Sequence, residues 1–168
     1  MWFHTLIKLD SAITIDSTIY TDERLFKEWN VDNPDNEFVK RPDRTHLLDI
    51  DRKPTLYLVA KADNRLVGYA GWIDEGSYVK IAGIRVHPDF RLKGIFGNLW
   101  NARDKKVGMK PSIAFTNITT MPIDLFISKL ERYGYDTKGY DVNKVEGIPK
   151  EIPEAYLEKY GNFLVKNA

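Results

Sequence analysis

Runs of apolar residues separated by short polar connections predict a sheet in the middle of the chain. Residues 55–61 and 65–73 form two such runs, and the three residues between them suit a hairpin. A third run, residues 78–86, is rich in β-branched and aromatic side chains and stops before Pro88, whose nitrogen cannot donate a hydrogen bond. The pattern therefore predicts three consecutive strands, the last of which ends near His87.

The segment after this third strand has apolar residues at the spacing of a helix. Apolar residues recur at helical intervals from Ile95 onward, which predicts a helix that begins near Gly94. Two more helices are predicted at residues 22–30 and 122–132, and two more strands at residues 3–9 and 112–116. We therefore expect an α/β fold of the α+β kind, in which helices flank a mixed, mostly antiparallel central sheet.

The remaining segments carry weaker patterns. Residues 10–20 are expected to form a polar turn, and Thr21 is expected to cap the helix that follows. Residues 31–54 are dense in charged residues and proline, so we expect a loop with a short helix near its end. In the C-terminal tail, Pro153 suits the first turn of an amphipathic helix that reaches Leu164.

Composition predicts a single domain over residues 1–168. The chain is 43% hydrophobic and 12% aromatic, which is enough for a sizeable core. Its formal net charge of +1 argues against nucleic-acid or membrane-surface binding through bulk charge. No apolar run approaches the roughly twenty residues that cross a bilayer, and the first residues lack the features of a secretory signal. We therefore expect a cytoplasmic protein.

Cysteine and histidine usage limits the possible chemistry. The absence of cysteine excludes disulfides, a thiolate nucleophile and cysteine ligands for a metal. The three histidines, His4, His46 and His87, lie far apart and form no spaced ligand motif, so we expect no metal site. The four tryptophans could stack on nucleic-acid bases, but their scattered positions make core packing the better explanation.

The turn between the third strand and the next helix has the chemistry of a phosphate site. It contains Arg91, Lys93 and Gly94 immediately before the predicted start of the helix. The first turn of a helix leaves backbone N–H groups without intrahelical acceptors and carries the positive end of the helix dipole. A diphosphate would be stabilised there. The alternative is an ordinary joint between a strand and a helix.

This turn and the order of the predicted elements resemble those of the GNAT acetyltransferases, which bind acetyl-coenzyme A. Val86-His87-Pro88 is similar to the family's strand end. Residues 91–96 are similar to its Arg-x-x-Gly-x-Gly/Ala turn, with Phe96 in place of the small residue. Tyr133-Gly134-Tyr135 resembles the family's aromatic-Gly-aromatic element. The resemblance covers about residues 55–140 and leaves residues 141–168 as a C-terminal extension.

The resemblance implies a site for the coenzyme A thioester, with acetyl-CoA as the cosubstrate. In the family, backbone groups at the end of the strand bind the pantetheine arm, and backbone amides of the turn bind the pyrophosphate. The cofactor-binding residues implied in this sequence are Ile84, Arg85, Val86, Arg91, Leu92, Lys93, Gly94, Ile95, Phe96 and Gly97.

Candidate catalytic residues are fewer. Family members often use a glutamate on or near the third strand, but residues 78–87 contain no carboxylate. Glu75 lies just before them, in a turn where a solvated acid is the alternative. His87 carries an imidazole that suits a base near neutral pH, or it is a polar residue at a strand exit. Asn117 could replace an asparagine that the family often has, whereas Leu130 stands where many members have a tyrosine acid.

Two functions remain open. The first is an acetyl-CoA-dependent N-acetyltransferase, which would act on an unidentified amine through a water-relayed base. The second is a catalytically inactive GNAT-fold component of an assembly, with a protein partner on the C-terminal tail. In the family, the region corresponding to residues 31–54 borders the acceptor. Its basic side chains are therefore either acceptor contacts or a solvated loop: Arg41, Arg44, His46 and Arg52.

Overall fold

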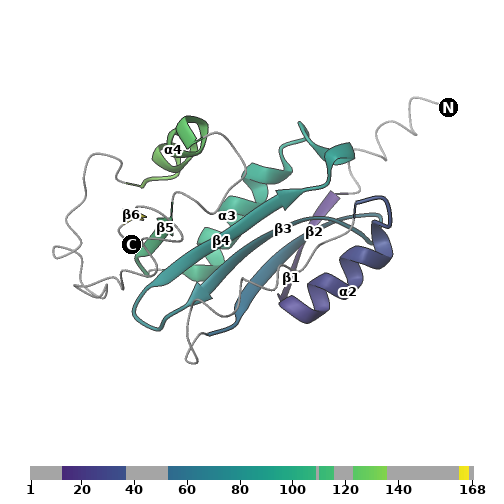
Figure 1. Cartoon of the computed structure of the whole chain (residues 1–168), viewed down its shortest axis with the longest axis horizontal. Helices are drawn as coiled ribbons and strands as arrows, with labels where there is room; N and C mark the ends of the chain where they lie inside the picture. Colours follow the sequence, from purple (N-terminus) through teal and green to yellow (C-terminus); the bar gives the residue numbers. More distant parts are fainter. Residues whose placement is uncertain (1–12, 37–52, 109, 116–122, 136–162, 167–168) are drawn as a thin grey trace. The chain divides into compact units, whose positions relative to one another are not determined.

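Six strands form one mixed sheet in the computed structural model, which describes residues 13–36, 53–108, 110–115, 123–135 and 163–166 (Figure 1). The elements are β1 (Ile13–Thr21), α2 (Asp22–Asp32), β2 (Thr55–Ala62), β3 (Arg65–Asp74), β4 (Val79–Val86), η2 (Pro88–Phe90), α3 (Ile95–Val107), β5 (Ser112–Phe115), α4 (Ile123–Arg132) and β6 (Phe163–Lys166). The strands lie in the order β1-β2-β3-β4-β5-β6. β1 and β2 are antiparallel, β4 and β5 parallel, and β5 and β6 antiparallel. The expected mixed sheet with flanking helices is confirmed.

The described residues belong to two compact units. The first contains β1, α2, β2, most of β3, the end of β4, η2 and nearly all of α3. The second contains the end of β3, the first part of β4, and then β5, α4 and β6. A single domain over residues 1–168 stays a prediction.

The central strands and helices follow the hydrophobic pattern closely. The β2–β3 hairpin turns at Asp63 and Asn64, whose φ angles of 48° and 68° are those that a tight two-residue turn needs. α2 begins after Thr21, whose hydroxyl accepts the Arg24 N–H at 3.3 Å, so the predicted N-cap is confirmed. No helix in the described parts of the chain has the length and apolarity to cross a membrane.

The segment before α2 is a strand, and the expectation of a polar turn there is wrong. Residues 13–16 pair with β2 in regular register. The register then shifts, because four steps from Asp16 to Tyr20 match only two steps along β2. Asp16 accepts the Thr18 N–H at 2.9 Å, which stabilises this bulge. The polar residues therefore bulge an edge strand rather than end it. The strand predicted at residues 3–9 lies outside the described residues.

In the first unit, the two faces of the strands carry different cores. The cluster on the α2 side consists of Tyr20, Leu25, Trp29, Tyr57, Val59, Leu66 and Tyr69. The cluster on the α3 side consists of Ala60, Ala62, Val67, Ala70, Val86, Ile95 and Leu99. Side chains alternate along β2 between these clusters, as they must in a strand. Aromatic residues therefore fill the α2 side, and smaller residues let α3 approach the strands.

Gly68 on β3 permits a close approach of α3. A Cβ atom built on this glycine would lie 3.0 Å from Leu99 Cδ1 and 3.1 Å from the Arg85 carbonyl oxygen. Leu66 and Tyr69 both face the α2-side cluster although they are three positions apart, so the alternation along β3 slips by one residue near Gly68. A residue without a side chain is required where β3, β4 and α3 meet.

In the second unit, α4 ends in a glycine cap. Gly134 has a φ of +94°, and its N–H donates to the Glu131 carbonyl at 3.1 Å. The Tyr135 N–H donates to the Leu130 carbonyl at 3.0 Å, which completes a Schellman motif. Leu130 and Tyr135, the two positions that carry the hydrophobic pair of this motif, are 0% and 3% exposed. The Tyr-Gly-Tyr element is thus a helix stop.

The last described residues of the tail form a strand. β6 pairs with β5 from Ser112 opposite Lys166 to Phe115 opposite Phe163. The expectation of a helix that reaches Leu164 is therefore wrong at its end, because β5 offers backbone partners that helical periodicity does not reveal. The rest of the expected helix lies outside the described residues.

Candidate functional site

The turn between β4 and α3 is open, and its backbone conformation alternates. The residues from Arg91 to Gly94 are all exposed. Leu92 has a φ of +63° and Gly94 a φ of +79°, with Lys93 between them. A Cβ atom on Gly94 would meet nothing within 4 Å. Such alternation points successive N–H groups toward one concave side, which is the arrangement of an anion-binding nest.

The described parts of the fold leave the N–H groups of this turn available. The amides of residues 92–95 have no acceptor among the described residues, whereas the Asn98 N–H donates to the Gly94 carbonyl at 3.1 Å. These amides lie at the N-terminus of a 13-residue helix, whose dipole adds positive potential. The turn can therefore hold an anion through its backbone alone.

Arg91 and Lys93 add two exposed cations to these amides. Arg91 Nε donates to the Val86 carbonyl at 3.2 Å, which fixes its guanidinium at the end of β4. Within the described ranges, no carboxylate lies at ion-pair distance from either side chain. The positive charge of the turn is thus not neutralised by these parts of the protein.

Phe96 does not fill this turn. Its ring lies beside Trp100, one helical turn further along α3, with the ring centroids 5.8 Å apart. The ring also packs against the α3-side cluster. The core of the first unit thus accommodates the bulk that stands where the family prefers glycine or alanine.

The end of β4 continues directly into this turn. Ile84 and Val86 belong with the α3-side cluster, whereas Arg85 contacts Trp29 of α2. The His87 N–H donates to the Val67 carbonyl at 2.7 Å, so pairing with β3 reaches the end of the strand. The predicted cofactor-binding residues of strand and turn therefore lie together in the first unit, and their role in binding stays a prediction.

On the other face of β4, side chains from distant parts of the sequence form a polar group. We call it the α2–β4 cluster, and it consists of Trp29, Asp35, Asn36, Arg65, Arg85 and His87. The Arg85 guanidinium lies 5.1 Å from the Trp29 ring centroid and donates to the side-chain oxygen of Asn36. Trp29 Nε1 donates to the Asn36 carbonyl at 2.6 Å. The start of the α2–β2 connection is thereby fixed against β4.

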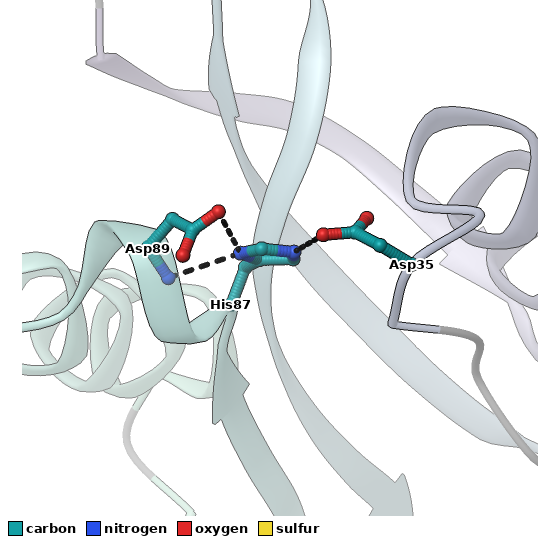
Figure 2. A group of neighbouring side chains, drawn as sticks. All are labelled: Asp35, His87 and Asp89. Carbon is teal, nitrogen blue, oxygen red and sulfur yellow. Dashed lines mark hydrogen bonds and ion pairs between the residues drawn. The ribbon is translucent and has the colours of Figure 1, made fainter.

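His87 lies between two carboxylates (Figure 2). Its Nδ1 accepts the Asp89 N–H at 3.1 Å and lies 3.9 Å from the Asp89 carboxylate. Nε2 is 3.6 Å from Asp35 Oδ2. The residue is 1% exposed, and its ring packs against Trp29 and Phe90. These contacts favour a structural role for His87, and its role as a base stays a prediction.

Asp35, His87 and Asp89 bring three potential metal-ligand atoms within 4.8 Å of one another. The two carboxylates, however, face opposite nitrogens of the imidazole (Figure 2). Nδ1 already accepts a backbone N–H, and Nε2 lies 3.4 Å from Nη2 of Arg65. An ion bound to either nitrogen would leave one carboxylate on the far side of the ring. The arrangement fits a network of polar contacts around a buried imidazole better than a metal centre, and the absence of a metal stays a prediction.

The C-terminal end of α2 is bound to the start of β3. Asn33 is 0% exposed; its Nδ2 donates to the Leu66 carbonyl and its Oδ1 accepts from Arg65 Nε, both at 2.9 Å. The Asp32 carboxylate accepts the Leu66 N–H at 2.8 Å. Both side-chain polar atoms of Asn33, Oδ1 and Nδ2, are thus hydrogen-bonded. These bonds fix the C-terminal end of α2 next to the α2–β4 cluster.

The turn acids before β4 have partners in the second unit. Glu75 Oε1 lies 3.0 Å from Nζ of Lys80. Asp74 accepts from Lys110 Nζ at 2.9 Å, and this ammonium, followed by the Gly76 N–H, holds the pKa of Asp74 below its ordinary value. Asn117 and the four basic candidates of residues 31–54 lie outside the described residues. The catalytic roles of Glu75 and Asn117 stay predictions.

Sequence reasoning did not single out Asp35, Asn36 or Arg65. The Asn-Pro-Asp-Asn run after α2 indicates a turn, but it does not reveal what the turn contacts. Arg85 and Asn36 are 49 positions apart in the sequence. No local pattern connects residues at that separation.

Comparison with solved structures shows a shared fold. Naa50 of Arabidopsis thaliana, in complex with the bisubstrate analogue CoA-Ac-MVNAL, has 16% identity and a TM-score of 0.52 over 94% of this chain and 99% of its own. An Elizabethkingia anophelis GNAT family acetyltransferase with acetyl-CoA bound has 15% identity and a TM-score of 0.54 over 94% and 99%. The ribosomal-protein-S18-alanine N-acetyltransferase of Escherichia coli has 12% identity and a TM-score of 0.54 over 91% and 90%.

The sequence itself matches a family model. No curated protein matches the chain. The model described as the acetyltransferase (GNAT) family matches residues 22–106, just over half of the 168 residues. The matched range includes α2, the β2–β3 hairpin, β4, the open turn and nearly all of α3. This chain therefore belongs to the GNAT acetyltransferase family.

Proposed function

We propose that this protein transfers an acetyl group from acetyl-CoA to an amine, and that the turn from Arg91 to Gly94 holds the pyrophosphate. The observation that carries the proposal is the open turn at the start of α3, with exposed amides and two exposed cations. Family membership supports the same reading. The acetyl-CoA and the bisubstrate analogue in the structural neighbours support a coenzyme A ligand.

The reaction requires little from acidic side chains of β4, which has no carboxylate in its eight residues. The amine nitrogen attacks the thioester carbonyl, the C–S bond breaks, and coenzyme A leaves as a thiolate. The amine loses one proton, which a water molecule can carry to a base beyond the strand. A thiolate is a good leaving group, so a protein acid is not essential, and Leu130 in place of a tyrosine does not prevent turnover.

Calorimetric titration with coenzyme A tests the cofactor site. Arg91→Ala should weaken binding about tenfold or more, because a charge-assisted hydrogen bond contributes about 1.5–3 kcal/mol. Lys105→Ala is the matched control, since it removes an exposed cation from the last turn of the same helix and should leave the affinity unchanged. Equal effects of both variants, or no binding at millimolar coenzyme A, would refute the proposed site.

Release of the coenzyme A thiol tests turnover. The chain has no cysteine, so a colorimetric thiol reagent has no protein background. Thiol release that depends on an added amine supports the transferase. The second candidate is a binding component without turnover, which the buried Leu130 and the carboxylate-free β4 favour. Coenzyme A binding without thiol release for any amine would select that candidate.

A further inference from the structure

We propose that Arg85 recognises a carboxylate on the acceptor, so that the preferred substrates are amines that carry a carboxylate close to the amino group. This inference rests on the proposed acetyl transfer, and it names the substrate class for that reaction. It starts from the position of Arg85 on β4 and from the partners of its guanidinium.

Arg85 projects from β4 toward α2. Its neighbours Ile84 and Val86 pack on the α3-side cluster, so alternation along the strand sends Arg85 to the opposite face. There the guanidinium lies over Trp29, 5.1 Å from the ring centroid, and donates to the side-chain oxygen of Asn36. Trp29 is itself fixed, because it is 0% exposed and its Nε1 binds the Asn36 carbonyl. The guanidinium plane is therefore held before any ligand arrives.

The charge of Arg85 is not neutralised by a carboxylate among the described residues. Its recorded polar partner is the neutral amide of Asn36. Two other arginines differ in this respect. Arg24 also stacks on an aromatic ring, 3.9 Å from the Tyr20 centroid, but it forms an ion pair with Glu28 at 2.6 Å. Arg65 lies 4.0 Å from Asp35.

A half-buried guanidinium that has no carboxylate partner among the described residues can act as a receptor for an anion. Removal of a charge from water is unfavourable unless an opposite charge and hydrogen bonds compensate for it. A guanidinium presents several N–H donors in a planar fork that matches a carboxylate, and Asn36 is the recorded acceptor for just one of them in the described structure. An acceptor carboxylate can bind the remaining donors in bidentate fashion.

The position on the strand links this anion site to the reaction. Arg85 lies between Ile84 and Val86, whose backbone is proposed to run beside the pantetheine arm. A carboxylate bound to the guanidinium would therefore lie on the α2 face of β4, close to the thioester that the backbone of the same strand is proposed to align. An amino group a few bonds from that carboxylate can reach the thioester carbonyl, whereas the same amine without the carboxylate loses its anchor.

The test compares amino acids with their carboxamides as acceptors, by thiol release. The series includes α-, β- and γ-amino acids, so that the distance between amine and carboxylate varies. We expect kcat/KM to be about tenfold or more higher for at least one acid than for its amide, mainly through KM. A carboxamide lowers the basicity of the neighbouring amine and leaves more of it unprotonated, so this bias opposes the expected result.

Variants assign the preference to Arg85. Arg85→Met should reduce the ratio of acid to amide to near 1, and Arg85→Lys, which keeps the charge but loses the planar fork, should give an intermediate ratio. Arg24→Met is the matched control, because that arginine also stacks on an aromatic ring, and it should keep the full ratio. Coenzyme A affinity, measured by calorimetry, should equal that of the wild type in all three variants, because the contact with coenzyme A implied for Arg85 uses its backbone and its side chain lies on the α2 side. Equal affinity also shows that the variants are folded.

Failure of this inference differs from failure of the proposed function. Two results would overturn the role of Arg85 while leaving acetyl transfer in place. One is equal thiol release with amino acids and their carboxamides, and the other is a preference for the acids that persists in Arg85→Met. Coenzyme A binding with no thiol release in either series would overturn the transferase itself, and the inference with it.

Discussion

The turn from Arg91 to Gly94 and the α2–β4 cluster both place cations near the end of β4, but they are built in opposite ways. The turn is contiguous in sequence, fully exposed, and has N–H groups with no acceptor among the described residues. The cluster joins residues up to 58 positions apart, namely Trp29 and His87, and both of these side chains are buried. The turn offers an anion its backbone N–H groups, whereas the cluster is proposed to bind an anion through the Arg85 side chain, which Trp29 and Asn36 hold in place.

This difference separates stability from binding. Trp29 belongs both to the polar α2–β4 cluster and to the hydrophobic α2-side cluster. The α2–β4 cluster therefore shares in the burial of apolar surface that stabilises the fold. The turn contributes little, because its side chains are exposed, and Leu92 is even strained there, with 105% exposure and a positive φ. Substitutions in the cluster should therefore change stability more than those in the turn.

Removal of the Trp29 side chain should have the largest effect on the free energy of unfolding. Trp29→Ala deletes a side chain that is 0% exposed and packs edge-on against Tyr69, with ring centroids 5.7 Å apart. The free energy of unfolding should fall by about 3–5 kcal/mol, measured by urea denaturation with circular dichroism. Val31→Ala on the same helix is the control, because Val31 is 74% exposed, and it should change stability by less than about 0.5 kcal/mol. Similar losses in both variants would contradict the contrast.

Relief of strain in the turn should have a smaller effect of opposite sign. Leu92→Gly removes a left-handed side chain that buries nothing, so the free energy of unfolding should rise by up to about 1 kcal/mol. Leu92→Ala keeps the left-handed conformation of a residue with a Cβ and should give no such gain. Thermal denaturation of both variants measures the difference, and a loss of stability in Leu92→Gly would contradict the strain.

The ion pair between Asp74 and Lys110 should have the smallest effect on stability, because solvent screens it. The pKa of Asp74 lies below the ordinary value of 3.8 because Lys110 and the Gly76 N–H stabilise the carboxylate. The Asp74 carboxylate therefore makes its full contribution to the free energy of unfolding above about pH 4. This contribution is lost as the pH falls through the pKa that Asp74 has in the folded protein. The side chain is 44% exposed, so the contribution should stay below about 1 kcal/mol. Asp74→Asn should lower the melting temperature slightly at pH 7 and by progressively less as the pH falls below 3.8, and prior Lys110→Met should remove most of the effect at pH 7.

The local patterns of the sequence predicted the elements that their own residues determine. The β2–β3 hairpin, the Thr21 cap and the turn before α3 depend on neighbours in the chain, so periodicity and turn chemistry were sufficient. The family motif at residues 91–96 predicted a phosphate site for the same reason, and the binding role of these residues stays a prediction. The bulge of β1 and the strand at Phe163–Lys166 were missed, because both exist through pairing with another strand.

Tertiary structure alone decided what lies against β4. The sequence by itself established a mixed sheet, an acetyltransferase-like turn and a strand without carboxylates. It did not reveal that Asn36 and Trp29 hold Arg85, nor that His87 lies buried between Asp35 and Asp89. Such contacts follow from how α2 packs on the strands, and the packing of a helix depends on the shapes of many distant side chains together rather than on any local pattern.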